Sequence, residues 1–381
     1  MIKTAQFTWD GALIPISESE EFSHSKAQLA FIFADRLQLS NEVIQQTQTK
    51  FPNATVVFGT TSGHFSNQEV LFDQPVITGV SFEKTKLEIF ELEATCLTDK
   101  EHPSHGKVQD LLNMPDIKAV LVLSEGSSTN GSELTSCLAT CNPKNVPVFG
   151  GMTADMERFE KTYAGINVLG TTPKIVIIGF IGKDIHFNFG IEGGWHVFGP
   201  ERTITSSYKN TLFELSHQNA LDLYKEYLGE YSAMLPASSL YFPLSVKSPD
   251  GDRFFVRTVL SINENNKSMT FAGDVPQGST VRFMKSNKDL LLDAAQEAIN
   301  KTAFKDAVPQ LIFLISCVGR KIVLGSRHDE ELELALQHYE HAEIKPTVTG
   351  FYSYGEIAPD GNFSPCDLYN QTITITSIYE Q

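Results

Sequence analysis

Two cysteines at helical spacing are the first residues in this sequence that could hold a metal ion. Cys137 and Cys141 stand four apart in a segment, 131–141, that predicts a helix, so both thiols lie on one helical face. A metal or redox site there needs further ligands, which the neighbouring sequence does not supply. Small buried side chains in a protein core are the competing interpretation.

Two histidine pairs also have spacings that metals use. His102 and His105 stand three apart, as do His338 and His341, which share one face of a predicted helix. A structural or catalytic site requires a third and a fourth ligand, and none lies near either pair. We therefore expect both pairs to be solvated surface residues, and metal catalysis is disfavoured.

A nucleophile is the remaining chemistry to consider. Cys317 stands where a buried strand opens into a turn, a position from which a thiol can attack a substrate. The sequence has no recognisable His–Asp partner pair, no phosphate loop and no Gly-x-Ser-x-Gly elbow. We therefore expect that this protein is not an enzyme.

Three copies of one unit must position these residues. Each copy consists of a strand, a helix, a strand, a glycine-rich turn and a strand, and self-similarity of this kind is strong architectural information. The copies begin with apolar strands at 29–34, 118–123 and 310–316 and end with strands at 75–82, 174–180 and 371–377. Near-continuous apolar runs are typical of strands buried on both faces. The sequence predicts an α/β fold in which these units form helix-covered mixed sheets.

A segment with a different pattern separates the second and third copies. Residues 184–285 contain one amphipathic helix and several short strands. We therefore place a boundary near residue 200 and predict two regions, 25–200 and 201–381.

The composition excludes several classes of partner. The chain of 381 residues carries 46 acidic and 30 basic residues, a formal charge of −16, so nucleic acid and anionic membranes are not expected to bind. Its apolar runs are far shorter than the roughly 20 residues that cross a bilayer, and the first residues do not resemble a signal peptide. Five scattered cysteines are typical of a reducing compartment. We expect a cytoplasmic protein.

Several stretches in the right order resemble the FIST family of bacterial sensory proteins. They are the run from Gly193 to Arg202, and the motifs 130–134, 270–276, 315–320 and 350–359. The resemblance implies a FIST N-like region over 25–200 and a FIST C-like region over 201–381. It also implies a ligand sensor of signal transduction. Because the resemblance spans almost the whole chain, we expect a stand-alone sensor acting through a separate histidine kinase or other signalling protein.

The resemblance further implies a b-type haem that senses nitric oxide, as in one branch of the family. No Cys-x-x-Cys-His motif is present, so such a haem would lack thioether bonds. His196 is the first candidate for the axial ligand and haem iron, because Trp195 and Phe198 flank it in a glycine-rich turn. His64 is the second candidate. The alternative is that Trp195 and Phe198 fill a junction between regions.

A small polar ligand, such as an amino acid, is the alternative that the family resemblance implies. Arg257 and Arg320 would then pair with a carboxylate and Glu356 with an ammonium group. Arg320 and Tyr354 stand in turns that follow strands of the third copy, and ligands of open α/β sheets gather at such strand ends. Ordinary ion pairs are the competing role for the arginines. A structural adaptor without a ligand is a third class, and the oligomeric state stays open, a homo-oligomer included.

Overall fold

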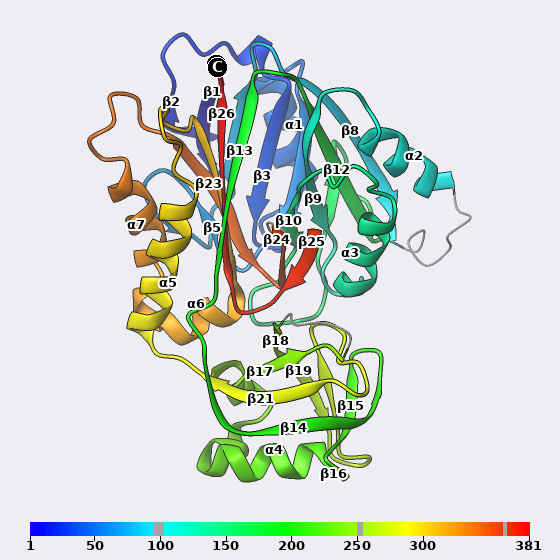
Figure 1. Ribbon diagram of the computed structural model, residues 1–381. Helices are drawn as coiled ribbons and strands as arrows, with labels where there is room; N and C mark the ends of the chain where they lie inside the picture. Colours follow the sequence, from blue (N-terminus) through cyan, green and yellow to red (C-terminus); the bar gives the residue numbers. More distant parts are fainter. Residues whose placement is uncertain (95–102, 250–253, 361–363) are drawn as a thin grey trace.

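A body of three six-stranded sheets stands above a smaller region built on an eight-stranded sheet (Figure 1). The computed structural model describes residues 1–94, 103–249, 254–360 and 364–381. Cys96 and His102 lie outside these residues. Within the described residues, no helix is both long and apolar enough to span a membrane.

The three predicted copies fold into the same strand arrangement, one in each sheet of the body. In each copy the first and second strands are parallel, and the last strand runs antiparallel beside the first. These strands are β3 (Leu29–Ala34), β4 (Thr55–Thr60) and β7 (Val76–Ser81); β9 (Ile117–Ser124), β10 (Val148–Met152) and β12 (Lys174–Ile181); and β22 (Leu311–Cys317), β23 (Thr347–Ser353) and β26 (Ile373–Glu380). The predicted α/β class with helix-covered mixed sheets is confirmed.

The turn segment of each copy pairs with a strand in the sheet of another copy. The hairpin of β5 (His64–Phe65) and β6 (Val70–Leu71) pairs with β23, and the hairpin of β24 (Gly355–Asp360) and β25 (Ser364–Tyr369) pairs with β10. Strand β11 (Ala164–Ile166) pairs with β4 and closes the cycle. The three copies therefore hold one another together through backbone hydrogen bonds.

The core of the body lies where the three sheets meet. Phe31 of the first copy contacts Phe313 of the third at 5.1 Å between ring centroids, and Phe149 of the second contacts Phe313 at 6.0 Å. All three rings are buried, and aromatic pairs of this kind stabilise a fold beyond the area that they bury. One shared core requires all three copies to be present.

Glycines at equivalent strand positions permit the close strand pairing. Gly150 has a φ of 137°, and a Cβ atom there would stand 1.9 Å from the carbonyl oxygen of Val122. Gly350 has a φ of 145°, and its Cβ would stand 1.8 Å from the carbonyl oxygen of Leu314. Only glycine adopts this backbone without strain, which explains the glycine that both copies carry.

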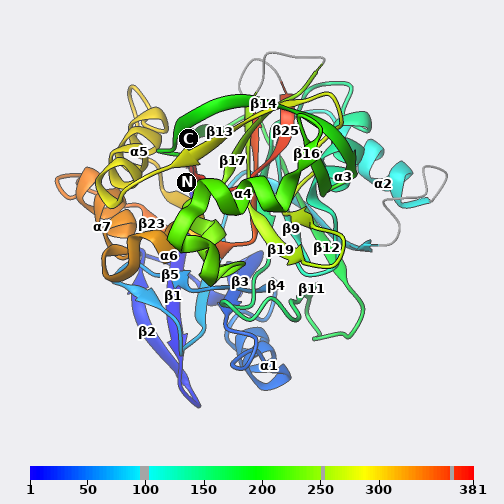
Figure 2. The same cartoon turned by 90° about the horizontal axis from the view of Figure 1, so that it is seen from below.

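Helices cover the outer faces of the sheets (Figures 1 and 2). Helix α1 (Asn41–Lys50) begins at the N-cap Ser40 and packs against the first sheet, and α2 (Pro103–Leu112) and α3 (Gly131–Thr140) pack against the second. Helices α5 (Lys288–Lys301) and α7 (Glu330–His338) cover the third sheet beside α6 (Val318–Leu324). Apolar residues three or four positions apart bury one stripe of a helix, as Leu291, Ala295 and Ala298 do in α5.

The smaller region is inserted between β13 (Ile185–Glu192) and α5, so the chain leaves the body and returns to it (Figure 1). Its sheet follows the order β18-β17-β21-β14-β15-β20-β19. Helix α4 (Ala220–Leu228) packs against this sheet through Leu221 and Tyr224. Its strands are β14 (His196–Tyr208), β15 (Thr211–Leu215), β16 (Gln218–Asn219), β17 (Leu244–Lys247), β18 (Phe254–Arg257), β19 (Val259–Asn263), β20 (Ser268–Phe271) and β21 (Thr280–Lys285).

The remaining elements lie at the edges. Strands β1 (Lys3–Trp9) and β2 (Leu13–Glu18) extend the first sheet, and β8 (Lys86–Glu93) extends the second. Short 3-10 helices are η1 (His24–Lys26), η3 (Gly229–Met234), η4 (Ala237–Tyr241) and η5 (Gly325–Arg327). Because β22, β23 and β26 form part of one six-stranded sheet, the third copy belongs to the body with the first two.

Candidate functional site: a cavity at the junction

A cavity of about 540 Å³ lies between α3 and β25 of the body and β17 and β18 of the smaller region. We call it the junction cavity. This volume is in the range of small-molecule sites. It is lined by Ser132, Thr135, Ser136, Ala139, Thr140, Val246, Ser248, Phe255, Arg257, Asp274, Pro276, Ser364, Cys366, Asp367 and Leu368.

The start of α3 ties the body to the smaller region at this cavity. The side chain of Asn130 caps the helix by accepting a hydrogen bond from the amide of Ser132 at 2.9 Å. Asn130 also donates to the carboxylate of Asp274 at 3.3 Å, and the amide of Asp274 donates to the Ser132 hydroxyl at 3.1 Å. The N-terminal end of α3, in the body, is therefore hydrogen-bonded to Asp274 of the smaller region.

Arg257 places a buried cation in the wall of the junction cavity. It is 6% exposed, and its guanidinium donates to the backbone carbonyls of Asp274, Val256 and Leu368. Burial lowers the pKa of Arg257 to about 10, although nearby Asp274 and Asp367 oppose this shift. The group therefore stays charged at neutral pH. Backbone carbonyls accept hydrogen bonds from its Nε and Nη1 atoms, and the carboxylates of Asp274 and Asp367, which also line the cavity, offset part of its charge.

Below the start of α3, a second cavity of about 480 Å³ also combines both regions. From the body it is lined by the loop 126–130, Met152, Phe159 and Tyr354, and from the smaller region by Asn210, Leu260, Ser261, Phe271 and Ala272. Tyr354 stacks on Phe159 with ring centroids 4.7 Å apart, and its hydroxyl donates to the carbonyl of Met156 at 3.2 Å. This is the position of the predicted ligand-binding Tyr354.

Glu125 shapes the loop between the two cavities. Its buried carboxylate accepts hydrogen bonds from the hydroxyls of Ser128 at 2.7 Å and Thr162 at 2.7 Å, and from the amide of Ser127 at 2.6 Å. Burial acts to raise the pKa of Glu125, but these hydrogen bonds prevail and lower it. Sequence reasoning missed this residue. The available signal is the run of small hydroxyl residues, Ser127 to Thr129, that begins two positions after this acid at the end of a buried strand.

Comparison with protein families supports the sequence resemblance. A FIST N domain matches residues 28–218, and a FIST C domain matches residues 220–359. The chain belongs to the FIST family. An uncharacterized protein of Methanocaldococcus jannaschii is 22% identical to this FIST chain over 390 residues, covering 91% of the chain and 73% of the archaeal protein. FIST domains are sensory domains of signal transduction.

Arg320, predicted to bind ligand in this FIST chain, lies inside the body. It is fully buried, and its guanidinium donates to one carboxylate oxygen of Glu331 at 2.9 and 2.7 Å. It also donates to the carbonyls of Gly193 at 2.6 Å and Leu291 at 2.8 Å. Gly193 and Leu291 lie at the two points where the chain leaves the body for the smaller region and returns from it. Arg320 therefore links the two connecting segments, which we call the two crossings.

Glu356 is buried beside the last strand of the third copy. Its carboxylate accepts hydrogen bonds from the hydroxyls of Ser353 at 2.5 Å and Thr372 at 2.8 Å. Burial raises the pKa of Glu356 to about 7, against the effect of these hydrogen bonds. Glu356 is not among the residues that line the junction cavity, so the structure does not bring the two predicted ligand-binding charges together there.

The predicted haem residues face three different surroundings. His196 is exposed at the start of β14. Trp195 packs against α5 and α6 and donates to the carbonyl of Gln371 at 2.7 Å, whereas Phe198 packs against Phe283 in the smaller region. A haem needs an enclosed apolar pocket around its axial ligand. These surroundings do not fit one, because Trp195 packs against the body and Phe198 packs into the core of the smaller region.

His64 is buried, and both of its ring nitrogens are used. Its Nε2 atom donates to the carbonyl of Gln74 at 2.6 Å, so its Nδ1 atom accepts from the hydroxyl of Thr61 at 2.9 Å. Burial lowers the pKa of His64 to about 4, which keeps the ring neutral. Neither nitrogen is available to an iron ion in this arrangement.

The haem hypothesis stays a prediction with a direct spectroscopic test. If haem bound through His196, the reduced protein would have a Soret band that shifts with nitric oxide and is lost in His196→Ala. The measurement is the visible spectrum of protein expressed with a haem precursor. A folded protein without a Soret band, or an unchanged spectrum in His196→Ala, contradicts the hypothesis.

The other candidates for chemistry are placed as follows. Cys317 is fully buried, and burial raises the pKa of its thiol, so it stays protonated. His338 and His341 are exposed, as predicted, but α7 ends at His338, so the two histidines do not share the predicted helical face. His105, in contrast, lies beside Cys137 and Cys141, although the sequence pattern indicated a surface residue without partners.

Proposed function

We propose that this FIST protein is a cytoplasmic sensor whose junction cavity binds a small carboxylate ligand of the amino-acid class. One observation carries this proposal: a buried, charged Arg257 forms part of the wall of a cavity of about 540 Å³ shared by both regions. A guanidinium presents several N–H donors to a carboxylate, and burial strengthens that attraction.

The other lining residues suit the rest of such a ligand. The carboxylate of Asp274 can accept a hydrogen bond from an ammonium group, and hydroxyls of Ser132 and Ser136 add polar contacts. Val246, Phe255 and Pro276 provide apolar surface for a side chain. The combination of opposite charges and apolar wall is the chemistry that an amino acid presents.

Signalling requires that the ligand prefer one arrangement of the two regions. The cavity walls come from α3 and β25 on one side and from β17 and β18 on the other, so a bound ligand bridges the junction. A ligand that contacts both walls stabilises the arrangement of the two regions in which both walls reach it, and the population shifts toward that arrangement. A histidine kinase or another signalling protein would read that arrangement.

A thermal-shift screen of the twenty L-amino acids tests the proposal. At 100 times its dissociation constant, a ligand that binds only the folded state stabilises it by about 2.7 kcal/mol. We expect at least one amino acid to raise the melting temperature. Its carboxamide should bind about 10–100-fold more weakly, because the charged contact with Arg257 is lost.

Two matched variants locate the binding. Ser136→Trp fills the junction cavity from α3 and should abolish the shift, whereas Thr49→Trp on α1 should preserve it, because Thr49 is an exposed helix residue outside the cavity. A screen in which no amino acid raises the melting temperature rejects the amino-acid class. Equal binding by the wild type and Ser136→Trp rejects the cavity.

A further inference from the structure

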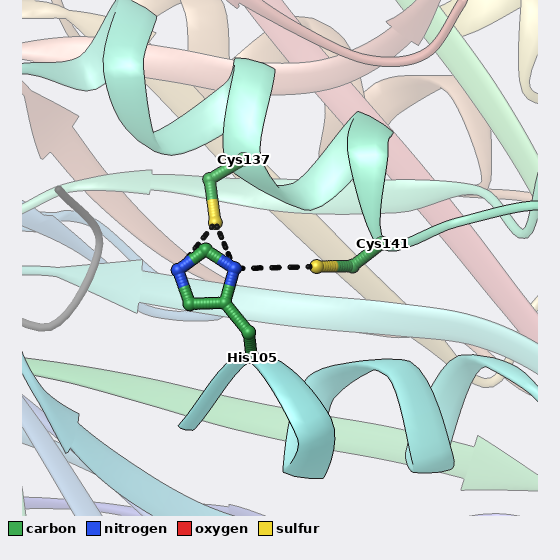
Figure 3. Close-up of side chains that lie close together, drawn as sticks. All are labelled: His105, Cys137 and Cys141. Carbon is green, nitrogen blue, oxygen red and sulfur yellow. Dashed lines mark hydrogen bonds between the residues drawn. The ribbon is translucent and has the colours of Figure 1, made fainter. Parts of the chain in front are cut away.

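Three metal-binding side chains meet on the outer face of the second sheet. The Nδ1 atom of His105 lies 3.7 Å from the sulfur of Cys137 and 3.8 Å from the sulfur of Cys141 (Figure 3). All three candidate ligand atoms lie within 4.8 Å of one another. No disulfide joins Cys137 and Cys141.

These separations match the edges of a zinc tetrahedron. Zinc binds sulfur at about 2.3 Å and imidazole nitrogen at about 2.0–2.1 Å, which puts a nitrogen and a sulfur ligand about 3.5–3.6 Å apart and two sulfur ligands about 3.8 Å apart. The observed distances from the His105 nitrogen to the two sulfurs are 3.7 and 3.8 Å. The two sulfurs lie within 4.8 Å of each other, so a bound zinc ion would draw them together by up to about 1 Å. The other ring nitrogen also lies 3.7 Å from Cys137, so rotation of the imidazole can aim its ligand atom.

Packing of two helices creates the cluster. Cys137 and Cys141 stand one turn apart on the same face at the end of α3, and His105 stands in the first turn of α2. Leu111 of α2 and Leu138 of α3 are buried against the same sheet, which keeps the helices side by side. Cys141 is buried, whereas Cys137 and His105 are half-buried, so the cluster has a rigid base and an open side.

We propose that His105, Cys137 and Cys141 bind a zinc ion. Two thiolates and an imidazole form a ligand set that zinc favours over magnesium or calcium, which prefer oxygen. Within the described residues the group has three members, so a tetrahedral ion keeps a fourth position for water. Zinc displaces the thiol protons, so binding releases protons and weakens as the pH falls.

This site is distinct from the junction cavity. The cavity is lined by Ser132, Ser136 and Thr140, on the neighbouring face of α3, and none of the three proposed zinc ligands lines it. Zinc binding can therefore fail without affecting the proposed amino-acid site, and the reverse also holds. The two proposals are tested separately.

Cobalt(II) is the spectroscopic probe. Titration of the reduced, metal-free protein with cobalt should give a thiolate-to-metal charge-transfer band and intense visible bands of a four-coordinate ion, saturating at one ion per chain. Added zinc should then remove these bands. Competition with a chromophoric chelator gives the zinc affinity.

Substitutions identify the ligands. Loss of a second-shell partner alone costs about 10–100-fold in metal affinity, so His105→Gln and Cys137→Ser should each weaken zinc binding at least about 10-fold. His341→Gln is the matched control, because His341 is an exposed histidine beside His338, and its affinity should equal that of the wild type. Circular dichroism checks that each variant is folded. Weak binding without thiolate bands, equal affinity in His105→Gln, or a Cys137–Cys141 disulfide that binds no zinc overturns the proposal.

Discussion

Arg320→Ala is expected to destabilise the folded protein by about 3–5 kcal/mol, because it leaves the Glu331 carboxylate buried without its counter-ion. Both side chains of this ion pair are 0% exposed, and the shortest contact between them is 2.7 Å. The guanidinium also satisfies the carbonyls of Gly193 and Leu291. The substitution therefore removes the counter-ion of Glu331, which keeps the hydrogen bond from the Tyr352 hydroxyl, and one hydrogen bond to each of the two carbonyls.

Chemical denaturation at neutral pH measures this loss. Arg327→Ala is the matched control, since Arg327 pairs with Glu330 and Asp289 at the surface, and exposed pairs contribute at most about 1 kcal/mol. The double variant Arg320→Met/Glu331→Leu should recover part of the stability, because it removes the unpaired charge. If Arg320→Ala costs no more than Arg327→Ala, the buried pair does not hold the two crossings together.

Glu380→Gln is expected to lower the free energy of unfolding by about 2–3 kcal/mol at pH 7. The Glu380 carboxylate accepts hydrogen bonds from the amides of Glu83, Lys84 and Thr85, from the Thr85 hydroxyl and from the amino group of Met1. Burial acts to raise its pKa, but these hydrogen bonds prevail and hold the pKa at about 2. A carboxyl group whose pKa is lowered by folding stabilises the folded protein when the pH is above the ordinary pKa of that group.

The pH dependence gives this prediction its sign. A carboxylate with a folded pKa of about 2 contributes fully above its ordinary value of 4.5, and the contribution is lost as the pH falls toward 2. Unfolding measured between pH 2 and pH 7 should therefore show a smaller acid-side loss in Glu380→Gln than in the wild type. Glu83→Gln is the control, because its side chain is 69% exposed and should change little. If the free energy of unfolding falls equally with pH in the wild type and in Glu380→Gln, the stabilising role of the Glu380 carboxylate is contradicted.

The two proposed sites differ in how much of them the sequence could indicate. Arg257 was a candidate carboxylate ligand from the family resemblance, and it does line a cavity. Arg320 was the stronger candidate because it follows a buried strand, yet it turns inward to Glu331. Position after a strand indicates where a side chain begins. Only packing decides whether that side chain points to solvent, a cavity or the core.

The zinc cluster shows the same limit. The sequence places Cys137 and Cys141 on one helical face, because that depends on residues four apart. His105 lies 32 residues away from Cys137 along the chain, and it reaches the thiols because α2 and α3 share one sheet. Periodicity identifies the buried face of a helix but does not identify the element that covers it.

By itself, the sequence determined the three repeated units, the strands buried on both faces and the class of fold. These depend on local apolar runs and on turns, which a chain carries in order. The tertiary structure alone decided that the turn segments β5, β24 and β11 join the sheets of other copies, and that the inserted region forms half of the junction cavity. Such contacts join residues far apart in the chain, and no local pattern records which distant backbone will satisfy a strand edge.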